Sequence, residues 1–408
     1  MGVARKYLCF LLQISLLLYL VGMLLYFFGK RSNQREVDYV YHKPTYDPHF
    51  ADQPDSYTIQ PHHLPYQLKV DLPTATNITE RQAAAFIVLV RNSELSGILQ
   101  SMHDVENRFN HKFNYPWIFL NDEPFTDEFQ KLTTLAASSR THYGLVNESM
   151  WGYPDWIDQH KAAERRERMK GLPYGLSESY RHMCRFQSGF FWRHPLVLSL
   201  KLEYYWRVEP DVRYYCDLDY DPFLYMKQNK KKYEHSGTIP TLWNTVKRFT
   251  SDMAKEGQII FDLPLTDTIF NFISKDEGRT YNGCHFWTNF EIARLDLWHT
   301  EAYQRFFEYL DQTGGFFYER WGDAPVHSIF AALYLRRDEI HFFNDVGYKH
   351  SIYQHCPAED QLIRRCSCNP EDSLDFKDHM SCLSEYMEAI NYNSREDKRT
   401  VHDLLLLQ

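Results

Sequence analysis

From Ala83 to Val90 every residue is apolar, and a short polar turn then leads into a helical pattern that ends near Val105. An uninterrupted apolar run of this length is typical of a strand buried on both faces. Asn92 or Ser93 is expected to cap the helix. A second strand pattern, at 117–120, is again followed by a helical one. Strands that alternate with helices favour a mostly parallel sheet with helices on its faces, so we predict an α/β fold.

A third strand pattern carries the first candidate site. The aromatic and β-branched run from Tyr204 to Val208 indicates a buried strand that ends at Pro210, because proline cannot donate to a sheet ladder. Glu209 and Asp211 therefore lie at the carboxyl end of this strand, where open α/β sheets bind ligands. Two hard oxygen donors suit a divalent cation that carries the phosphates of a substrate. The plainer alternative is a solvated acidic turn.

Composition narrows the function classes. Hydrophobic residues make up 44% of the 408 residues, enough for a sizeable core, and aromatic residues make up 16%. Tyr and Trp pair a flat apolar face with a polar tip and so suit sugar recognition, although most of them are expected in the core. The net charge of -9 and the lack of a long basic stripe argue against nucleic acid as a partner. No P-loop, GxGxxG or GxSxG motif is present.

The amino-terminal segment predicts a membrane anchor. Residues 7–28 are almost wholly apolar and carry no charge, the stretch is long enough to span a bilayer, and no small-residue cleavage site follows. Basic residues lie on both sides of the span, so charge alone does not orient it. Residues 29–80 are polar and rich in proline, as expected for a stem. Sequons at Asn77 and Asn147 favour a lumenal location for the bulk of the chain.

Seven cysteines follow the span, and the eighth, Cys9, lies within it. In an oxidising lumen such cysteines form disulfides, and the odd number leaves one thiol without an intramolecular partner. Zinc is the competing interpretation, but the chain lacks a pair of CxxC motifs.

Three further stretches hold polar residues that could carry chemistry. Glu291 lies among aromatic residues, which would raise the pKa of its carboxyl group. Asp323 follows Trp321-Gly322, and His350 ends a segment that begins at Phe342. The acidic residues from Asp217 to Asp221 form a rival cluster, which we interpret as solvated or helix-capping. Taken singly, each of these stretches is more often structural than functional.

Together, six ordered motifs between Ala83 and Cys356 closely resemble those of the fungal Golgi α-1,2-mannosyltransferases, which are retaining type II membrane enzymes. The motifs are Arg91–Ser93, Tyr180–Phe186, Trp206–Val212, Cys284–Ile292, Trp321–Ser328 and Asp345–His350. They contain tryptophans and cysteines and are therefore highly specific. The chain departs from the family pattern at two places. Thr288 stands where the family has Ser, and the segment 232–238 differs from the corresponding family segment.

The resemblance implies a GT-A-like, Rossmann-like fold with a mixed, mostly parallel sheet, GDP-mannose as donor and Mn²⁺ as cofactor. It implies that Glu209 and His350 are the metal ligands and that Glu291 is the proposed nucleophile. It places Asp323 near the transferred mannose and Tyr180 near the donor phosphates. Arg91 would lie near the nucleotide, and Asp211 would lie in the donor site beside Glu209. A Glu and a His suit manganese, which accepts mixed oxygen and nitrogen ligands.

The resulting prediction is a Golgi mannosyltransferase with a cytoplasmic tail (1–6), a signal-anchor (7–28), a lumenal stem (29–80) and a catalytic domain (81–408). Its acceptor is a mannose-terminated glycan, N-linked or O-linked, of a glycoprotein. Two alternatives remain open from the residues. A retaining glycosidase would use Glu291 and Asp323 as its carboxyl pair, and a lumenal lectin would bind mannan on an aromatic platform without turnover.

Overall fold

The computed structural model describes residues 81–229, 240–375, 381–391 and 399–406. The predicted tail, membrane span and stem lie outside these residues, as does 232–238. Within the described ranges, none of the helices combines the length and the apolar character needed to cross a bilayer.

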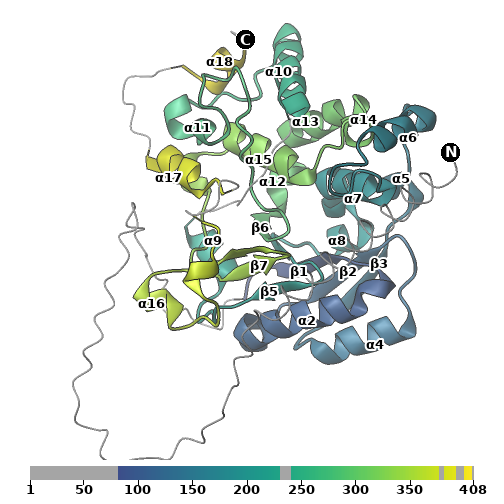
Figure 1. Cartoon of the computed structure of the whole chain (residues 1–408), viewed down its shortest axis with the longest axis vertical. Coiled ribbons are helices and arrows are strands. Elements are labelled where there is room, and N and C mark those ends of the chain that lie inside the picture. Colours follow the sequence, from purple (N-terminus) through teal and green to yellow (C-terminus); the bar gives the residue numbers. More distant parts are fainter. Residues whose placement is uncertain (1–80, 230–239, 376–380, 392–398, 407–408) are drawn as a thin grey trace, which may run out of the picture. The chain divides into compact units, whose positions relative to one another are not determined.

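The main sheet has five strands in the order β3-β2-β1-β4-β6 (Figure 1). The four strands β1, β2, β3 and β4 run parallel to one another, and the edge strand β6 is antiparallel to β4. Their bounds are β1 Ala84–Leu89, β2 Trp117–Asn121, β3 Thr141–Leu145, β4 Tyr204–Arg207 and β6 Glu291–Arg294. The prediction of a mixed, mostly parallel α/β sheet is confirmed.

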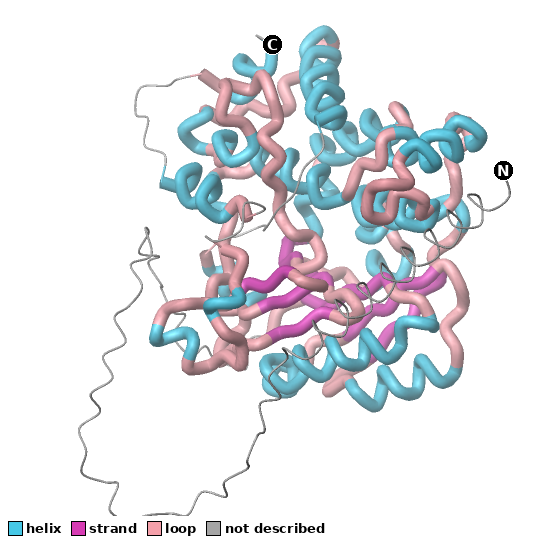
Figure 2. Tube along the Cα trace, viewed as in Figure 1, coloured by secondary structure: helices cyan, strands magenta, loops and turns pink. Residues whose placement is uncertain are grey.

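Helices flank this sheet. The helices α2 and α4 lie along one side of it, whereas α7, α13, α14 and α15 pack against one another on the other side (Figures 1 and 2). The bounds are α2 Leu95–Val105, α3 His111–Phe113, α4 Asp127–Ala136, α5 Glu148–Trp151, α6 Gln159–Arg168, α7 Glu178–Gly189, α8 Pro195–Ser199, α9 Pro222–Gln228, α10 Pro240–Lys255, α11 Phe270–Ile273, α12 Leu295–His299, α13 Glu301–Gln312, α14 Gly315–Tyr318, α15 Asp323–Tyr334, α16 Asp360–Ile363, α17 Leu383–Asn391 and α18 Val401–Leu406.

Aromatic side chains fix the strands of the main sheet against one another. Phe86 of β1 stacks on Trp117 of β2, with ring centroids 4.3 Å apart, and contacts Trp206 of β4 at 5.4 Å. All three side chains are buried. Each fully buried aromatic side chain stabilises the fold by roughly 2–3 kcal/mol. Much of the aromatic content therefore builds the core, which also holds the carboxyl ends of β1, β2 and β4 in place.

A second sheet joins the first through the segment after β4. It is antiparallel, in the order β5-β7-β8, with β5 Val212–Tyr214, β7 Tyr348–His350 and β8 Tyr353–His355. Asp211 makes the turn into β5 with a backbone φ of +60°, and its amide donates to the carbonyl of Gly97 in α2. Because Val212 pairs with His350, this sheet brings a residue near the end of the chain beside the end of β4.

We expect Gly97→Ala to destabilise the protein. A Cβ at Gly97 would lie 2.6 Å from Oδ1 of Asp211, so the strained turn that follows β4 would have to move. Overpacking of this kind costs about 1–3 kcal/mol. The measurement is the melting temperature of the variant against that of Gly171→Ala, since a Cβ at Gly171 meets nothing within 4 Å. Equal melting temperatures would contradict the close approach of α2 to this turn.

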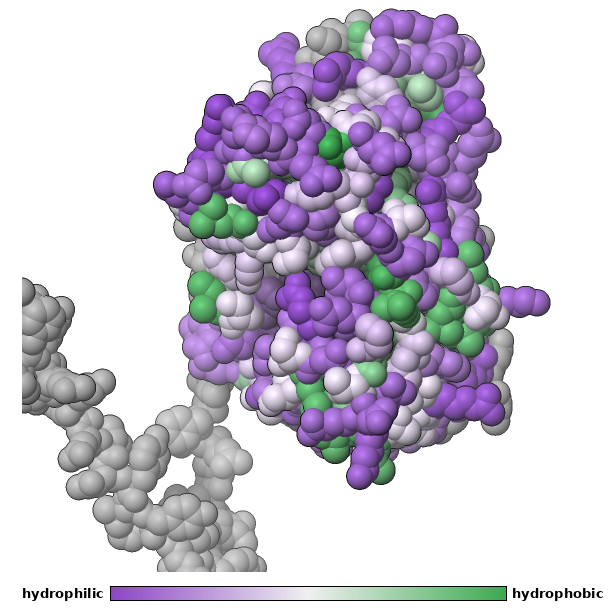
Figure 3. Space-filling model, turned by 90° about the vertical axis from the view of Figure 1, so that its right-hand side faces the viewer, coloured by the Kyte–Doolittle hydropathy of each residue, from purple (hydrophilic) through white to green (hydrophobic). Residues whose placement is uncertain are grey.

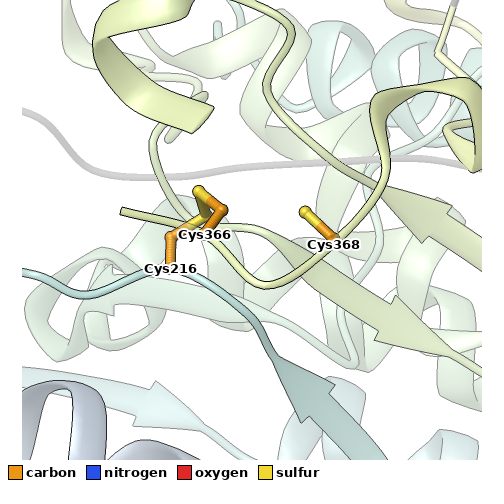
Figure 4. Close-up of side chains that lie close together, drawn as sticks. All are labelled: Cys216, Cys366 and Cys368. Carbon is orange, nitrogen blue, oxygen red and sulfur yellow. A yellow bond between two sulfur atoms is a disulfide. The ribbon is translucent and has the colours of Figure 1, made fainter. Parts of the chain in front are cut away.

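Six of the seven cysteines after the span form disulfides, as expected for an oxidising compartment. The pairs are Cys216–Cys366, Cys284–Cys382 and Cys356–Cys368. Figure 4 shows Cys368 beside the Cys216–Cys366 bond, but these three sulfurs are oxidised and are not thiolate ligands for zinc.

Cys184 is the single free cysteine of the described residues, and it is buried in α7. Burial raises the pKa of its thiol, which keeps the group protonated and unreactive. The expectation of one thiol without an intramolecular partner is therefore confirmed for this part of the chain.

The predicted cap of the first helix is wrong. A short 3-10 turn, Asn92–Glu94, precedes α2, and the residue before α2 is Glu94, which makes no side-chain capping bond. Asn92 is engaged elsewhere, because its amide donates to the carbonyl of Pro124 and accepts from the backbone of Thr126, both at 3.0 Å. It ties the turn after β1 to the loop after β2.

The acidic cluster from Asp217 to Asp221 has the structural roles that we expected. Asp221 caps α9, because its carboxylate accepts from the backbone N–H of Phe223 at 2.9 Å. The exposed carboxylates of Asp217 and Asp219 pair with basic side chains of the segment that follows α2.

The face shown in Figure 3 is mostly hydrophilic, and its hydrophobic areas are small and separate. Single exposed apolar residues of this kind are normal on soluble domains.

Candidate active site

A pocket of about 520 Å³ opens where the carboxyl ends of three parallel strands meet. Its lining includes Arg91 after β1, Asn121 and Asp122 at the end of β2, and Arg207 and Glu209 at the end of β4. This is the ligand-binding edge of an open α/β sheet.

The buried guanidinium of Arg207 organises the floor of this pocket. Its Nη1 donates to Oδ2 of Asp323 at 2.6 Å, and its Nη2 donates to Oε1 of Glu209. Thr288 also donates to Oδ2 of Asp323, at 2.7 Å. A buried charge is tolerated only when it is paired. Arg207 therefore holds the carboxylates of Glu209 and Asp323 in place, although these residues are 114 positions apart in the chain (323 − 209).

Glu209 and His350 form a pair that could hold a cation. Oε2 of Glu209 lies 3.6 Å from Nε2 of His350, and both residues line the pocket. This distance is long for a hydrogen bond, but two ligand atoms that share one divalent cation at a right angle lie about 3–3.6 Å apart. The remaining positions would be left for substrate phosphates and water.

The charge state of Glu209 suits this role. Burial raises the pKa of its carboxyl group, but Arg207 and His350 outweigh burial and lower this pKa to about 2. Glu209 is therefore ionised at any physiological pH, as a metal ligand must be.

Glu291 lies beneath the pocket rather than in its lining. It faces Arg207 across the antiparallel β4–β6 pair, it is only 1% exposed, and its Oε2 lies 3.2 Å from Nδ1 of His327 in α15. The ring of His327 in turn stacks on Trp298 with centroids 4.2 Å apart. Burial raises the pKa of the Glu291 carboxyl group, the nearby charge of Asp323 adds to this, and His327 partly offsets it. The raised pKa is the shift predicted from its aromatic surroundings.

The structure brings five of the seven predicted site residues to the pocket wall: Arg91, Tyr180, Glu209, Asp323 and His350. Glu291 and Asp211 are not among the lining residues. Asp211 lies against α2, because its left-handed backbone turns its carboxylate toward Gly97.

Three further residues, Arg207, Thr288 and His327, contact the predicted site residues but were not predicted as site residues themselves. A charged residue within the apolar run of β4 was an available signal for Arg207. Thr288 differs from the family pattern, and His327 lies in the motif Trp321–Ser328, but nothing in the sequence pairs His327 with Glu291, which it contacts from α15.

A family described as "Glycolipid 2-alpha-mannosyltransferase" matches residues 42–391. The chain belongs to this family. Glycolipid 2-alpha-mannosyltransferase 2 of Candida albicans is 52% identical over 322 residues, which cover 76% of this chain and 68% of the relative. Alpha-1,2 mannosyltransferase KTR1 of Saccharomyces cerevisiae is 50% identical over 330 residues, which cover 78% of this chain and 81% of the relative. The predicted mannosyltransferase family is thus confirmed.

Solved structures agree with this assignment. Core-mannan synthase A of Aspergillus fumigatus, in a Mn/GDP form, is 34% identical with a TM-score of 0.69, and the match covers 79% of this chain and 92% of that one. The mannosyltransferase Ktr4p of S. cerevisiae, in complex with GDP, is 32% identical with a TM-score of 0.70, and the match covers 80% and 87%. The chain therefore has the fold of known mannosyltransferases.

We expect loss of the His327 side chain to shift the acid limb of the activity profile to higher pH. In the role that the resemblance implies for Glu291 its carboxyl group must be ionised, so activity is expected to fall as pH drops through its raised pKa. The groups around Glu291 are His327, Asp323, Arg207 across the strand pair, and Tyr303, and His327 is the neighbour that lowers this pKa. His327→Ala removes that effect and raises the pKa further.

The measurement is kcat/KM for mannosyl transfer between pH 4 and 8. His327→Asn, whose amide can still donate to Glu291 but carries no charge, should shift the acid limb less than His327→Ala does. Superimposable profiles for the Ala variant and the unsubstituted protein would show that His327 does not set the protonation of Glu291.

Proposed function

We propose that the chain is a retaining α-1,2-mannosyltransferase that moves mannose from GDP-mannose to a mannose-terminated glycan of a glycoprotein, with Mn²⁺ as cofactor. The observation that carries this proposal is the pocket at the carboxyl edge of the sheet. In this pocket the ionised carboxylate of Glu209 lies beside His350, and Arg207 links Glu209 to Asp323. The family and the Mn/GDP form of a relative support it.

In this proposal Glu209 and His350 would hold the cation, which would neutralise charge on the diphosphate as GDP leaves. Arg91, at the end of β1, lies on the nucleotide side of the pocket, and Tyr180 lies near the phosphates. Asp323, fixed by Arg207 and Thr288, stabilises positive charge on the transferred mannose. Asp211 has no ligand contact in this proposal and instead positions Glu209 through the turn against α2. The arrangement corresponds to a GT-A-like fold.

We assign Glu291 an electrostatic role rather than direct attack. Its carboxylate is buried beneath the pocket and faces His327, whereas Asp323 lines the pocket. A negative charge in this water-excluded position favours the oxocarbenium-like transition state of transfer. The acceptor hydroxyl then approaches on the face from which GDP leaves, which gives retention without a covalent intermediate.

The proposed location is the Golgi membrane, with a single amino-terminal anchor and a lumenal catalytic domain. The apolar run at 7–28 and the three disulfides support this topology.

The test uses the full chain in detergent with GDP-mannose and methyl α-mannoside, with and without Mn²⁺, and follows GDP release and the anomeric configuration of the disaccharide by NMR. We expect an α-linked disaccharide that forms only with Mn²⁺. A β-linked product would overturn retention. Hydrolysis of mannosides without nucleotide would favour the glycosidase alternative, and mannan binding without any turnover would favour the lectin.

A further inference from the structure

The segment that joins α6 to α7 holds an exposed tyrosine at the edge of the pocket. Tyr174 lines the pocket, is 67% exposed and has a backbone φ of +55°, in the left-handed region that favours glycine. A non-glycine residue in this conformation is strained, and residues of this kind cluster at functional sites. An exposed aromatic ring gains little from burial that could offset the strain.

The backbone around Tyr174 is nevertheless held firmly. Arg181, which is fully buried in α7, donates to the carbonyl of Gly175 at 2.9 Å and to that of Ser177 at 2.7 Å. A Cβ at Gly175 would lie only 1.8 Å from the carbonyl oxygen of Met169, so the chain is closely packed there. Tyr174 is therefore presented at a defined position, and binding a ligand there would cost little ordering entropy.

The ring of Tyr174 lies parallel to that of Tyr180, with centroids 5.1 Å apart and an angle of 4° between the planes. The hydroxyl of Tyr180 reaches inward, to within 3.9 Å of the position that a Cβ on Gly322 would occupy, next to Asp323. The two rings thus form a continuous aromatic wall that leads from the floor of the pocket to its edge. Ser177 and Ser179 also line this part of the pocket and offer hydroxyl groups beside the wall.

We propose that the exposed part of the Tyr174 ring is a stacking platform for a pyranose ring of the acceptor glycan. This inference rests on the proposed function. In a retaining transfer the acceptor approaches from the side on which the leaving group departs. We place Tyr180 near the donor phosphates, and the ring of Tyr174 stacks on that of Tyr180. Tyr174 therefore lies on the side from which the acceptor approaches. The apolar face of a sugar suits an aromatic ring, and the serine hydroxyls can bond to its edge. The nucleotide would find polar groups elsewhere in the pocket, because Arg91 and Asp122 line it at the ends of β1 and β2.

The test compares Tyr174→Ala with Tyr174→Phe, which keeps the ring, and with Leu176→Ala. Leu176 is the matched control, because it is 55% exposed on the same segment but does not line the pocket. Two readouts are used on the full chain: KM and kcat for α-1,2-mannobiose as acceptor, and the equilibrium binding of mannobiose in the presence of GDP and Mn²⁺. The dissociation constant of GDP is measured for each variant.

We expect Tyr174→Ala to raise KM for mannobiose about 10-fold, which corresponds to about 1.4 kcal/mol, with kcat changed less than about twofold. Mannobiose binding should weaken by a similar factor, whereas Tyr174→Phe, which keeps the ring, should retain most of the mannobiose affinity and Leu176→Ala should behave as the unsubstituted chain does. Unchanged mannobiose binding in Tyr174→Ala would overturn the platform. Weaker GDP binding with unchanged mannobiose binding would instead assign the ring to the nucleotide base. The binding of mannobiose can be measured without any transfer. If the unsubstituted chain shows no transferase activity, the proposed function is refuted, but the effect of Tyr174→Ala on mannobiose binding still tests the platform.

Discussion

Replacing Glu209 by Gln is expected to abolish Mn²⁺-dependent transfer, with a fall of about 1,000-fold in kcat/KM. The substitution keeps the volume of the side chain but removes the charge that faces His350. A change in a partner outside the ligand shell already weakens metal binding about 10–100-fold, so loss of a ligand charge should weaken Mn²⁺ binding by about 100-fold or more. The measurement is direct Mn²⁺ binding, by electron paramagnetic resonance of the free ion, alongside the transfer rate.

Two further variants make this prediction specific. His350→Ala should weaken Mn²⁺ binding to a similar degree, since it removes the second ligand. Asp217→Asn, which alters an exposed carboxylate paired with Arg108, should leave both Mn²⁺ binding and the transfer rate unchanged. If Glu209→Gln binds Mn²⁺ as tightly as the unsubstituted chain, the assigned metal site is wrong.

Glu291→Gln is expected to lower kcat by about 100–1,000-fold, which is the usual effect of removing one preorganised electrostatic group. The amide is close in size to the carboxyl group, so the buried site beside His327 should stay filled and the dissociation constant of GDP should not change. The measurements are single-turnover transfer and GDP binding. Full activity in this variant would remove Glu291 from the mechanism.

A second variant at this position separates the electrostatic role from direct attack. In Glu291→Ala, added azide would rescue a missing nucleophile and give a β-mannosyl azide, because azide would enter from the opposite face of the sugar. We expect no such product, since Glu291 lies beneath the pocket and not in its lining. Formation of the β-azide would establish Glu291 as the nucleophile of a double displacement.

The strands of the main sheet were predictable because their signal is local. The apolar runs at Ala83–Val90, Trp117–Leu120 and Tyr204–Val208 appear as β1, β2 and β4. Parallel pairing followed from the helices between them. Parallel strands share one carboxyl edge, so the sequence also placed Glu209 at the ligand-binding side of the sheet. The cap of α2 was mispredicted, because Asn92 bonds to the loop after β2, a contact that no local pattern contains.

The family was recognisable from the sequence because motifs such as 206–212 and 284–292 combine rare residues in a fixed order. Motif order does not give distances. It placed Asp211 in the donor site next to Glu209, but a positive φ turns Asp211 toward α2. The pairing of the seven cysteines after the span was likewise visible only in the folded chain.

The α/β class, the edge of the sheet that binds ligands, and the residue types that a metal and a sugar phosphate require could all be inferred from local patterns in the chain. Which of these residues meet depends on the folded arrangement. The pairing of β5 with β7 carries His350 to Glu209, and the buried Arg207 joins Glu209 to Asp323. The packing of α15 on β6 sets His327 against Glu291. The physical reason is that these contacts depend on strand pairing and side-chain packing between segments far apart in the chain, and a linear pattern encodes neither.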